Sequence, residues 1–239
     1  MTNAALPDGV RVYAIGDIHG RIDLLERLLD VIDTDLSVAP AQSVVEVFLG
    51  DYVDRGPDCA GVLKRVGEEV PGRTRVRLMG NHEAAMNAAL VDGTAMGRWL
   101  SFGGDATLRS YGIEPNEWAH DLQALQPVVQ SLLPERDLAL LAGLDYSHRI
   151  GDVFFAHAGI RPGVPLDEQS SHDLLWIREE FLNHLGRLPA FVVHGHTPVE
   201  RPQIGPWRAN VDTGAVYGGT LTALVLENGR YRLLSVAGA

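Results

Sequence analysis

Five short polar clusters hold the side chains that are able to do chemistry in this sequence: GDIHG (16–20), GDYVDRG (50–56), GNHE (80–83), HAGIRP (157–162) and HGHTP (194–198). Together they supply nine potential metal ligands: Asp17, His19, Asp51, Asp54, Asn81, His82, His157, His194 and His196. Manganese, iron and zinc accept such a mixture of carboxylate, imidazole and amide oxygen, whereas calcium and magnesium rarely bind so many histidines. Because one ion needs roughly four to six ligands, nine candidates predict two ions that share a carboxylate.

The formal charges of this predicted centre favour a phosphate ligand. Two divalent ions bring four positive charges, of which Asp17 and Asp51 would neutralise two. The chain as a whole has a formal net charge of -11, so the attraction for phosphate has to be local. Arg55 directly follows Asp54, and a planar guanidinium group matches the geometry of phosphate oxygens.

Each polar cluster follows a short apolar or β-branched run that predicts a strand. These runs are VRVYAI (10–15), SVVEVFL (43–49), TRVRLM (74–79), DVFFA (152–156) and AFVV (190–193). Open α/β sheets bind ligands beyond the carboxyl ends of their strands, where loops from several strands converge. We therefore expect the five clusters to form one shared site.

The segments between the strands predict the rest of the fold. RIDLLERLLDVI (21–32) has apolar residues at helical spacing, and CAGVLKRVGEEV (59–70) is a weaker case. This alternation favours parallel strands over residues 10–80. Residues 84–151 break it and predict a mostly helical insertion that caps the site. Residues 219–236 predict a hairpin around Asn228-Gly229. No linker is evident, so we expect one domain, residues 1–239.

Composition excludes several classes of protein. The acidic balance argues against a broad surface for nucleic acid. The single cysteine, Cys59, excludes an internal disulfide framework and fits a reducing compartment. The first residues lack the pattern of a signal peptide, and no apolar run is long enough to span a bilayer. We therefore expect a soluble cytoplasmic protein with no membrane partner.

GDIHG, GDYVDRG and GNHE, in this order and at this spacing, resemble the motifs of the PPP-type metallophosphoesterases, the serine/threonine protein phosphatase family. Four later motifs are similar to its bacteriophage lambda phosphatase branch: WL-x-x-GG (99–104), WIREE (176–180), GHTP (195–198) and VDTGAVYGG (211–219). The resemblance implies an α/β metallophosphoesterase fold, which is a β-sandwich of mixed sheets flanked by helices in four α/β/β/α layers. The insertion at about 84–151 would be its helical cap.

The resemblance also implies a role for each motif residue. Asp17 and His19 would bind the first metal, Asp51 would bridge both, and the second would be completed by Asn81, His157 and His196. The expected cofactors are two manganese ions, with iron or zinc as alternatives. His82 would be the general acid, with Asp54 orienting its ring, and Arg55 and Arg178 would bind the phosphate. Water activated by the two ions would attack phosphorus directly, without a phosphoenzyme.

Several of these residues have a plain structural alternative. His157 could be a core histidine, and Arg178 could be only a cation on a helix surface. His196 is preferred to His194 as a ligand, since it occupies the GHT position, and His194 could either line the pocket or end a strand. Trp99 and Phe102 are expected in the core of the cap. Asp212 could shape a loop or hydrogen-bond to a ligand histidine.

Three functions remain to be weighed. The main expectation is a phosphomonoesterase acting on phosphoserine and phosphothreonine in proteins, without a regulatory subunit. The alternative is hydrolysis of diadenosine tetraphosphate or a similar nucleotide on the same metal core. Enzymes of that kind tend to lose the Asp of the VDRG motif, and Asp54 is present. A catalytically silent scaffold is the third, and it predicts broken ligands, of which we find none.

Overall fold

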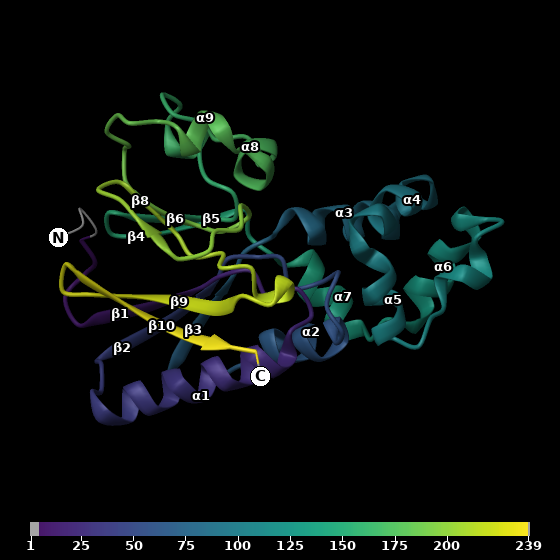
Figure 1. Ribbon diagram of the computed structural model, residues 1–239, viewed down its shortest axis with the longest axis horizontal. Coiled ribbons are helices and arrows are strands. Elements are labelled where there is room, and N and C mark those ends of the chain that lie inside the picture. Colours follow the sequence, from purple (N-terminus) through teal and green to yellow (C-terminus); the bar gives the residue numbers. More distant parts are fainter. Residues whose placement is uncertain (1–4, 239) are drawn as a thin grey trace.

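The computed structural model describes residues 5–238, so the ends of the predicted domain, residues 1–4 and 239, lie outside it. Two five-stranded sheets pack face to face (Figure 1). Strands of the first, in the order β10-β9-β1-β2-β3, are β1 (Val10–Ile15), β2 (Ser43–Phe48), β3 (Arg73–Arg77), β9 (Thr220–Glu227) and β10 (Arg230–Ala237). Strands of the second, in the order β4-β5-β6-β8-β7, are β4 (Ser147–Ile150), β5 (Val153–Ala156), β6 (Phe191–His194), β7 (Gln203–Ile204) and β8 (Arg208–Asn210).

Helices cover the outer face of each sheet. Helices α1 (Ile22–Val38) and α2 (Cys59–Gly67) lie against the first sheet, and α8 (Ser171–Trp176) and α9 (Glu179–Leu182) lie over the second (Figure 1). The order helix, sheet, sheet, helix confirms the predicted four-layer fold. Whether the chain is a single domain stays a prediction.

Successive side chains of β1 belong to different apolar clusters, so the first sheet has a core on each of its faces. Val12 and Ala14 belong to the apolar cluster between the two sheets, whereas Tyr13 and Ile15 belong to the cluster shared with α1 and α2. Successive side chains of a strand point to opposite faces, so one apolar run serves both layers. A third cluster, which includes Phe181, joins the second sheet to α8 and α9.

All five predicted strands are present, three in the first sheet and two in the second. The pairs β1–β2, β2–β3 and β5–β6 are parallel, so their carboxyl ends meet at one edge of the sandwich. The predicted hairpin is formed by β9 and β10. Asn228 and Gly229 have φ values of 51° and 69°, the positive values that a type I′ turn requires.

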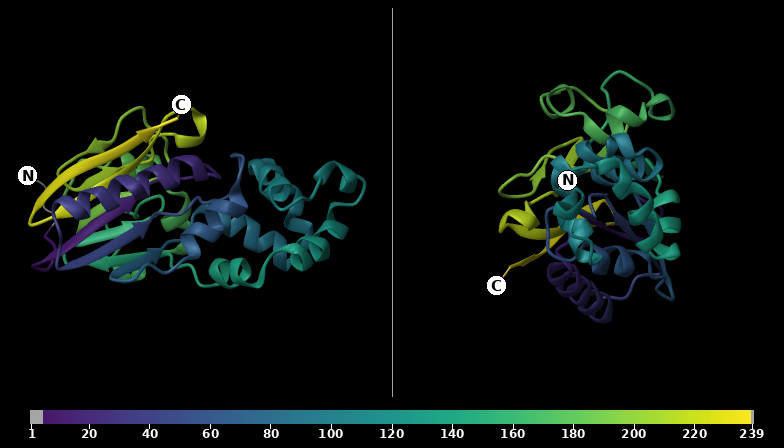
Figure 2. Two further views of the ribbon diagram at one scale, coloured as in Figure 1. Left: turned by 90° about the horizontal axis from the view of Figure 1, so that it is seen from below. Right: turned by 90° about the vertical axis from the view of Figure 1, so that its right-hand side faces the viewer.

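A helical lobe extends from one end of the sandwich (Figures 1 and 2). It comprises α3 (Asn81–Val91), α4 (Met96–Trp99), α5 (Asp105–Ser110), α6 (Leu122–Leu132) and α7 (Glu135–Ala142). The predicted insertion is therefore helical, but its end was placed too late. Residues 147–150 are strand β4, a polar edge strand paired with β5 alone, and so short a polar segment has little strand signal.

Candidate dinuclear metal centre

The structure brings all ten predicted site residues into one connected cluster at the carboxyl ends of β1, β2, β3, β5 and β6. Asp17, His19, Asp51 and Asp54 lie in loops after the first two strands, and Asn81 and His82 begin helix α3. His157 and His196 follow strands of the second sheet, and Arg178 lies between α8 and α9. Both sheets therefore contribute to the site.

Two groups of buried side chains could each hold an ion. One consists of His19, Asp51 and His82, and the other of Asp51, His157 and His196, with the donor atoms of each group within 4.8 Å of one another. Asp51 is common to both groups, as expected for a bridging carboxylate. Asp17 lies outside these groups, and its carboxylate accepts the backbone N–H of His196 at 3.0 Å.

Backbone carbonyls fix the orientation of two histidines. Nδ1 of His19 lies 2.8 Å from the carbonyl of Val53, and Nδ1 of His157 lies 2.9 Å from the carbonyl of Leu49. A carbonyl only accepts, so each Nδ1 carries the proton and Nε2 is left with a lone pair. This is the usual arrangement around a metal-binding imidazole.

Nε2 of His157 faces two oxygens. Asn81 Oδ1 lies 2.9 Å from it, and Asp51 Oδ1 lies 3.4 Å from it. Burial lowers the pKa of His157 below its ordinary value and so favours the neutral imidazole, whose proton lies on Nδ1 against the carbonyl of Leu49. Converging lone pairs of this kind are stabilised by a cation, so the donor set fits a metal ion.

The charges of the other donors agree with this fit. Burial raises the pKa of Asp17 well above its ordinary value, and the negative charges of Asp212 and Asp51 add to this effect. Burial also lowers the pKa of His196 to about 2, and the neighbouring His157 acts in the same direction. Crowded carboxylates beside an imidazole with a lowered pKa form a site that divalent cations would stabilise.

His82 and Asp54 form a buried pair. Nδ1 of His82 donates to Oδ2 of Asp54 at 2.7 Å, and Nε2 of His82 points toward Asp51 Oδ2 at 3.9 Å. Thus one ring nitrogen is held by a carboxylate and the other is directed to the centre, which suits a positioned proton donor.

The helical lobe in turn holds Asp54. Thr107 Oγ1 donates to Asp54 Oδ1 at 2.6 Å and accepts the backbone N–H of Asp54 at 2.9 Å. The indole N–H of Trp99 lies 3.1 and 3.2 Å from the two carboxylate oxygens. Trp99 is buried in the lobe, as expected, but its contact with Asp54 and the contribution of Thr107 were not predicted.

Glu83 is a second residue that we did not single out from the sequence. Its buried carboxylate accepts the backbone N–H groups of Asp51, Tyr52 and Val53, and also that of Gly80. The signal was available, because Glu at the third position of a helix is typical of a capping box. Glu83 therefore ties the start of α3 to the loop that carries Asp51.

The loops of the centre are conformationally strained. Positive φ values occur at six non-glycine residues of the range 5–238, and five of them belong to the site: His19, Asp51, Asp54, Arg55 and His196. Left-handed backbone is unfavourable for residues with a Cβ atom and persists only where surrounding contacts enforce it. The clustering of this strain marks the loops as a functional region.

Two exposed arginines lie at the rim. Nη1 of Arg55 is 2.7 Å from Nε2 of His19, and Nε of Arg178 donates to Nε2 of His196 at 3.2 Å. The guanidinium of Arg55 also lies over the exposed ring of Tyr217, with 5.7 Å between Cζ and the ring centroid. Both arginines are thus placed where an anion bound at the centre would meet them.

Asp212 and His194, for which the sequence left two alternatives each, have defined contacts in the structure. Asp212 accepts the backbone N–H of Gly214 at 3.0 Å and shapes its loop, and within the described residues it makes no hydrogen bond to a ligand histidine. His194 ends strand β6 with its ring 4.9 Å from that of Phe181. It therefore packs in the core beneath the second sheet rather than lining the centre.

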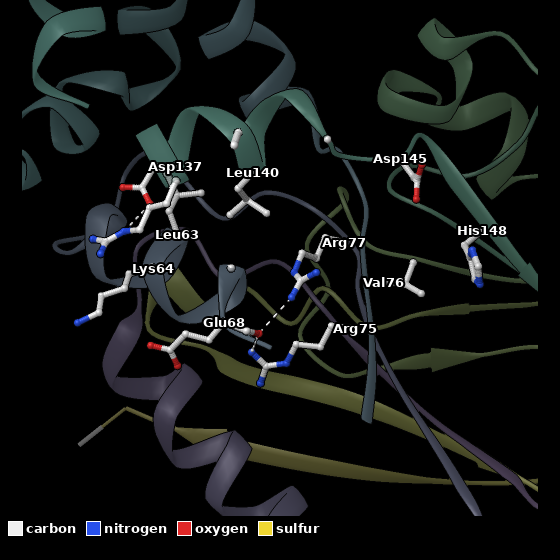
Figure 3. A pocket seen from close by; sticks show the side chains of 14 residues that line it. Leu63, Lys64, Glu68, Arg75, Val76, Arg77, Asp137, Leu140, Asp145 and His148 are labelled. Carbon is white, nitrogen blue, oxygen red and sulfur yellow. Dashed lines mark hydrogen bonds and ion pairs between the residues drawn. The ribbon is translucent and has the colours of Figure 1, made fainter. Parts of the chain in front are cut away.

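A separate cavity of about 500 Å³ lies between α2, β3 and α7 (Figure 3). Arg75 and Arg77 extend along it and donate to the backbone carbonyl of Glu68, just beyond the end of α2. Arg136 contacts Asp137 on the opposite wall. The predicted residues of the metal centre are absent from this cavity's lining, and these arginines serve to join a helix to an edge strand.

Comparison with known proteins agrees with this geometry. The sequence model of the calcineurin-like phosphoesterases matches residues 10–229. The chain belongs to this family. The matched range includes every residue of both candidate donor groups. Membership of the bacteriophage lambda branch stays a prediction.

The relatives of this phosphoesterase have two kinds of name. Bis(5′-nucleosyl)-tetraphosphatase PrpE [asymmetrical] of Oceanobacillus iheyensis is 26% identical over 234 residues, which cover 90% of this chain and 88% of the relative. PrpE of Geobacillus thermodenitrificans is 28% identical over 236 residues, covering 90% of each. Serine/threonine-protein phosphatase 1 of Salmonella typhimurium is 33% identical over 217 residues, covering 88% and 89%.

Two solved structures are similar to this chain in fold. A structure described as that of a candidate diadenosine tetraphosphatase superposes with a TM-score of 0.66 at 27% identity, covering 99% of this chain and 97% of the other. A cold-active protein-tyrosine phosphatase of a psychrophilic Shewanella species gives 0.60 at 18% identity, covering 98% and 83%. The second likeness supports the phosphoesterase fold alone. Within residues 5–238, none of the helices has the length and apolarity to cross a membrane.

Proposed function

We propose that this phosphoesterase hydrolyses dinucleoside polyphosphates of the bis(5′-nucleosyl) tetraphosphate type. The observation that carries the proposal is its similarity, along about nine-tenths of both chains, to tetraphosphatases from more than one bacterium. This reverses the preference drawn from Asp54, since the comparisons support the nucleotide alternative better than the protein phosphatase. Two rim arginines beside the metal donors suit a substrate with several phosphates.

The residues would divide the work as follows. Six residues would hold two divalent ions: Asp17, His19, Asp51, Asn81, His157 and His196. When bound, such ions polarise phosphoryl oxygens and lower the pKa of water, so that water attacks phosphorus near neutral pH. Arg55 and Arg178 would bind the phosphate oxygens of the substrate and orient the phosphorus under attack.

His82 would serve the leaving group. Hydrolysis joins water oxygen to one phosphorus and breaks the bond between that phosphorus and the bridging oxygen. The bridging oxygen leaves with a negative charge, and His82 Nε2 is placed to give it a proton while Asp54 holds the ring. A terminal phosphate is a far better leaving group than an alkoxide, so this step matters less for a nucleotide than for phosphoserine.

A parallel assay tests the proposal. The metal-loaded protein is given diadenosine tetraphosphate and a phosphoserine peptide, and kcat/KM is measured for both on one preparation. We expect the dinucleotide to be preferred by at least tenfold. Preference for the phosphopeptide would instead support a serine/threonine phosphatase, the second candidate, which the Salmonella relative favours at 33% identity.

Further expectations from the sequence remain part of the proposal. These are manganese as the metal, a cytoplasmic location, a single domain, and the lack of nucleic-acid, membrane and regulatory-subunit partners. The geometry argues against the hypothesis of a silent scaffold, since every predicted ligand lies in the cluster. Metal analysis of the assayed preparation addresses it directly, because a scaffold would show neither bound metal nor turnover.

A further inference from the structure

A small cavity of about 200 Å³ is lined by residues of α3 and α4, by Ala95 just before α4, and by Trp176 at the end of α8. Its lining consists of four alanines, two tryptophans and one arginine: Ala84, Ala85, Ala88, Ala95, Arg98, Trp99 and Trp176. At roughly 30 Å³ for each water molecule, the space would hold about seven waters. It is therefore the size of one heteroaromatic ring system and is too small for a whole nucleotide.

Aromatic contacts join this cavity to the metal centre. The ring of Trp176 lies 6.1 Å from that of His196 and 5.8 Å from that of Phe102. Phe102 in turn lies 5.8 Å from His82. Trp176 therefore lines the cavity on one side and contacts a donor of the centre on another.

The cavity walls suit a flat apolar group. Ala84, Ala85 and Ala88 stand on helix α3, where their short side chains leave a shallow floor, and the partly buried Trp176 offers a ring for stacking. Stacking of a base on an aromatic side chain is worth about 1–3 kcal/mol and tolerates every base. Ligand sites are typically apolar with a few placed polar groups.

The placed polar group is Arg98. Its side chain is exposed, with Cζ 5.9 Å from the Phe102 centroid. It forms no ion pair with any residue in the described part of the chain, so it is available to an anion. Arg98 therefore offers a cation next to a slot for a ring and beside Phe102, which contacts His82 of the centre.

We propose that this cavity binds the nucleobase of the dinucleoside polyphosphate that lies farther from the phosphorus under attack. The base stacks on Trp176 over the alanines of α3, and Arg98 binds the polyphosphate chain that leads to it. This inference rests on the proposed function and adds to it a subsite that selects substrates with a second nucleoside.

Filling the cavity tests the subsite. Ala88→Leu adds volume at an exposed helix position where leucine and alanine have similar helix propensity, so folding is retained. We expect the ratio of kcat/KM for diadenosine tetraphosphate to kcat/KM for an aryl phosphate to fall at least tenfold. Ala139→Leu, at an exposed alanine of α7 outside this cavity, is the matched control and should leave the ratio unchanged.

The arginine is tested separately. Arg98→Gln should lower the same ratio about tenfold, while Arg98→Lys, which keeps the charge, should retain most of it. An unchanged ratio in both Ala88→Leu and Arg98→Gln would overturn the subsite and leave the proposed function standing.

Binding without turnover separates the two hypotheses. In metal-free protein, calorimetric titration with adenosine 5′-diphosphate should show binding that Ala88→Leu weakens at least tenfold and that Ala139→Leu does not weaken.

The outcomes separate the base site from the proposed function. If the wild-type enzyme failed to cleave the dinucleotide yet showed this binding pattern, the proposed function would be wrong and the base site right. Absence of binding to metal-free wild-type protein, or binding that Ala88→Leu leaves intact, would contradict the base site. If instead the protein bound a phosphopeptide and no nucleotide, and if Ala88→Leu weakened the binding of the peptide, the cavity would be assigned to a peptide side chain.

Discussion

Asp54 is the residue on which the lobe and the metal centre meet. It receives hydrogen bonds from the ring of His82, the hydroxyl of Thr107 and the indole of Trp99. The orientation of His82 therefore depends on two side chains of the lobe that do not touch the metal donors. At the scale of single residues, two predictions follow from these contacts.

The first concerns the proposed role of His82 as the proton donor. His82→Asn should slow hydrolysis of an alkyl phosphate such as a phosphoserine peptide by roughly 10²–10⁴, the range for general acid catalysis. Hydrolysis of an aryl phosphate with an acidic phenol, or of diadenosine tetraphosphate, should lose much less because these leaving groups need little protonation. The measurement is kcat on the three substrates, and equal losses on all of them would remove His82 from this role.

The second concerns the support of Asp54. Thr107→Val removes the hydroxyl that donates to Asp54 and should lower kcat for the alkyl phosphate about tenfold, with KM nearly unchanged. Thr107→Ser restores a hydroxyl and should recover most of the rate. A purely structural role for Thr107 would lower the rates on alkyl and aryl phosphates together. The ratio of these two rates therefore distinguishes a structural role from a role in positioning Asp54 and His82.

At the scale of elements, Glu83 couples helix α3 to the loop after β2. Glu83→Gln replaces an acceptor by an amide whose N–H₂ cannot bond to backbone N–H groups. Leaving buried donors unpaired costs about 1–3 kcal/mol, so we expect Tm to fall by roughly 5–10 °C. Glu200→Gln, at an exposed position, should leave Tm within about 1 °C of the wild-type value. Equal Tm values for Glu83→Gln and Glu200→Gln, measured by calorimetry, would contradict the coupling of α3 to this loop.

Helix α1 is tied to the hairpin by Asp35, which pairs with Arg232 of β10 and accepts from Tyr13 of β1. Burial opposes ionisation, but hydrogen bonds from Arg232 and Tyr13 outweigh it and lower the pKa of Asp35. A carboxyl group with a lowered folded pKa stabilises above its unfolded value of about 3.9 and loses this effect below it. Between about pH 5 and 3, Tm of the wild type should therefore fall more steeply than that of Asp35→Asn.

At the scale of the whole molecule, the two sheets share the metal centre. Binding of manganese to chelator-treated protein should raise Tm, since a ligand at 100 times its Kd stabilises by about 2.7 kcal/mol, or roughly 5–10 °C. Asp51→Asn alters the carboxylate common to both donor groups and should lose most of this rise and both bound ions. Metal content and Tm measured together test this; full metal content in Asp51→Asn would refute the bridging role.

Much of this architecture was predictable because the apolar runs are strong local signals. Strands β1, β2, β3, β5 and β6 and the hairpin were identified, and with them the loops that carry the donors. Strands β4, β7 and β8 were missed, since they have at most four residues and depend on pairing rather than on pattern. The bonds from Trp99 and Thr107 to Asp54 span 45 and 53 positions, and no local pattern encodes such contacts.

The order of the donors along the chain has a consequence for biosynthesis. Asp17, Asp51 and Asn81 emerge early in translation, whereas the imidazoles of His157 and His196 emerge only with the second sheet. The first donor group, which consists of His19, Asp51 and His82, is thus present once the chain has been made to residue 82, whereas the second group stays incomplete until His196 emerges. Completion of the second ion site is therefore a late step of maturation.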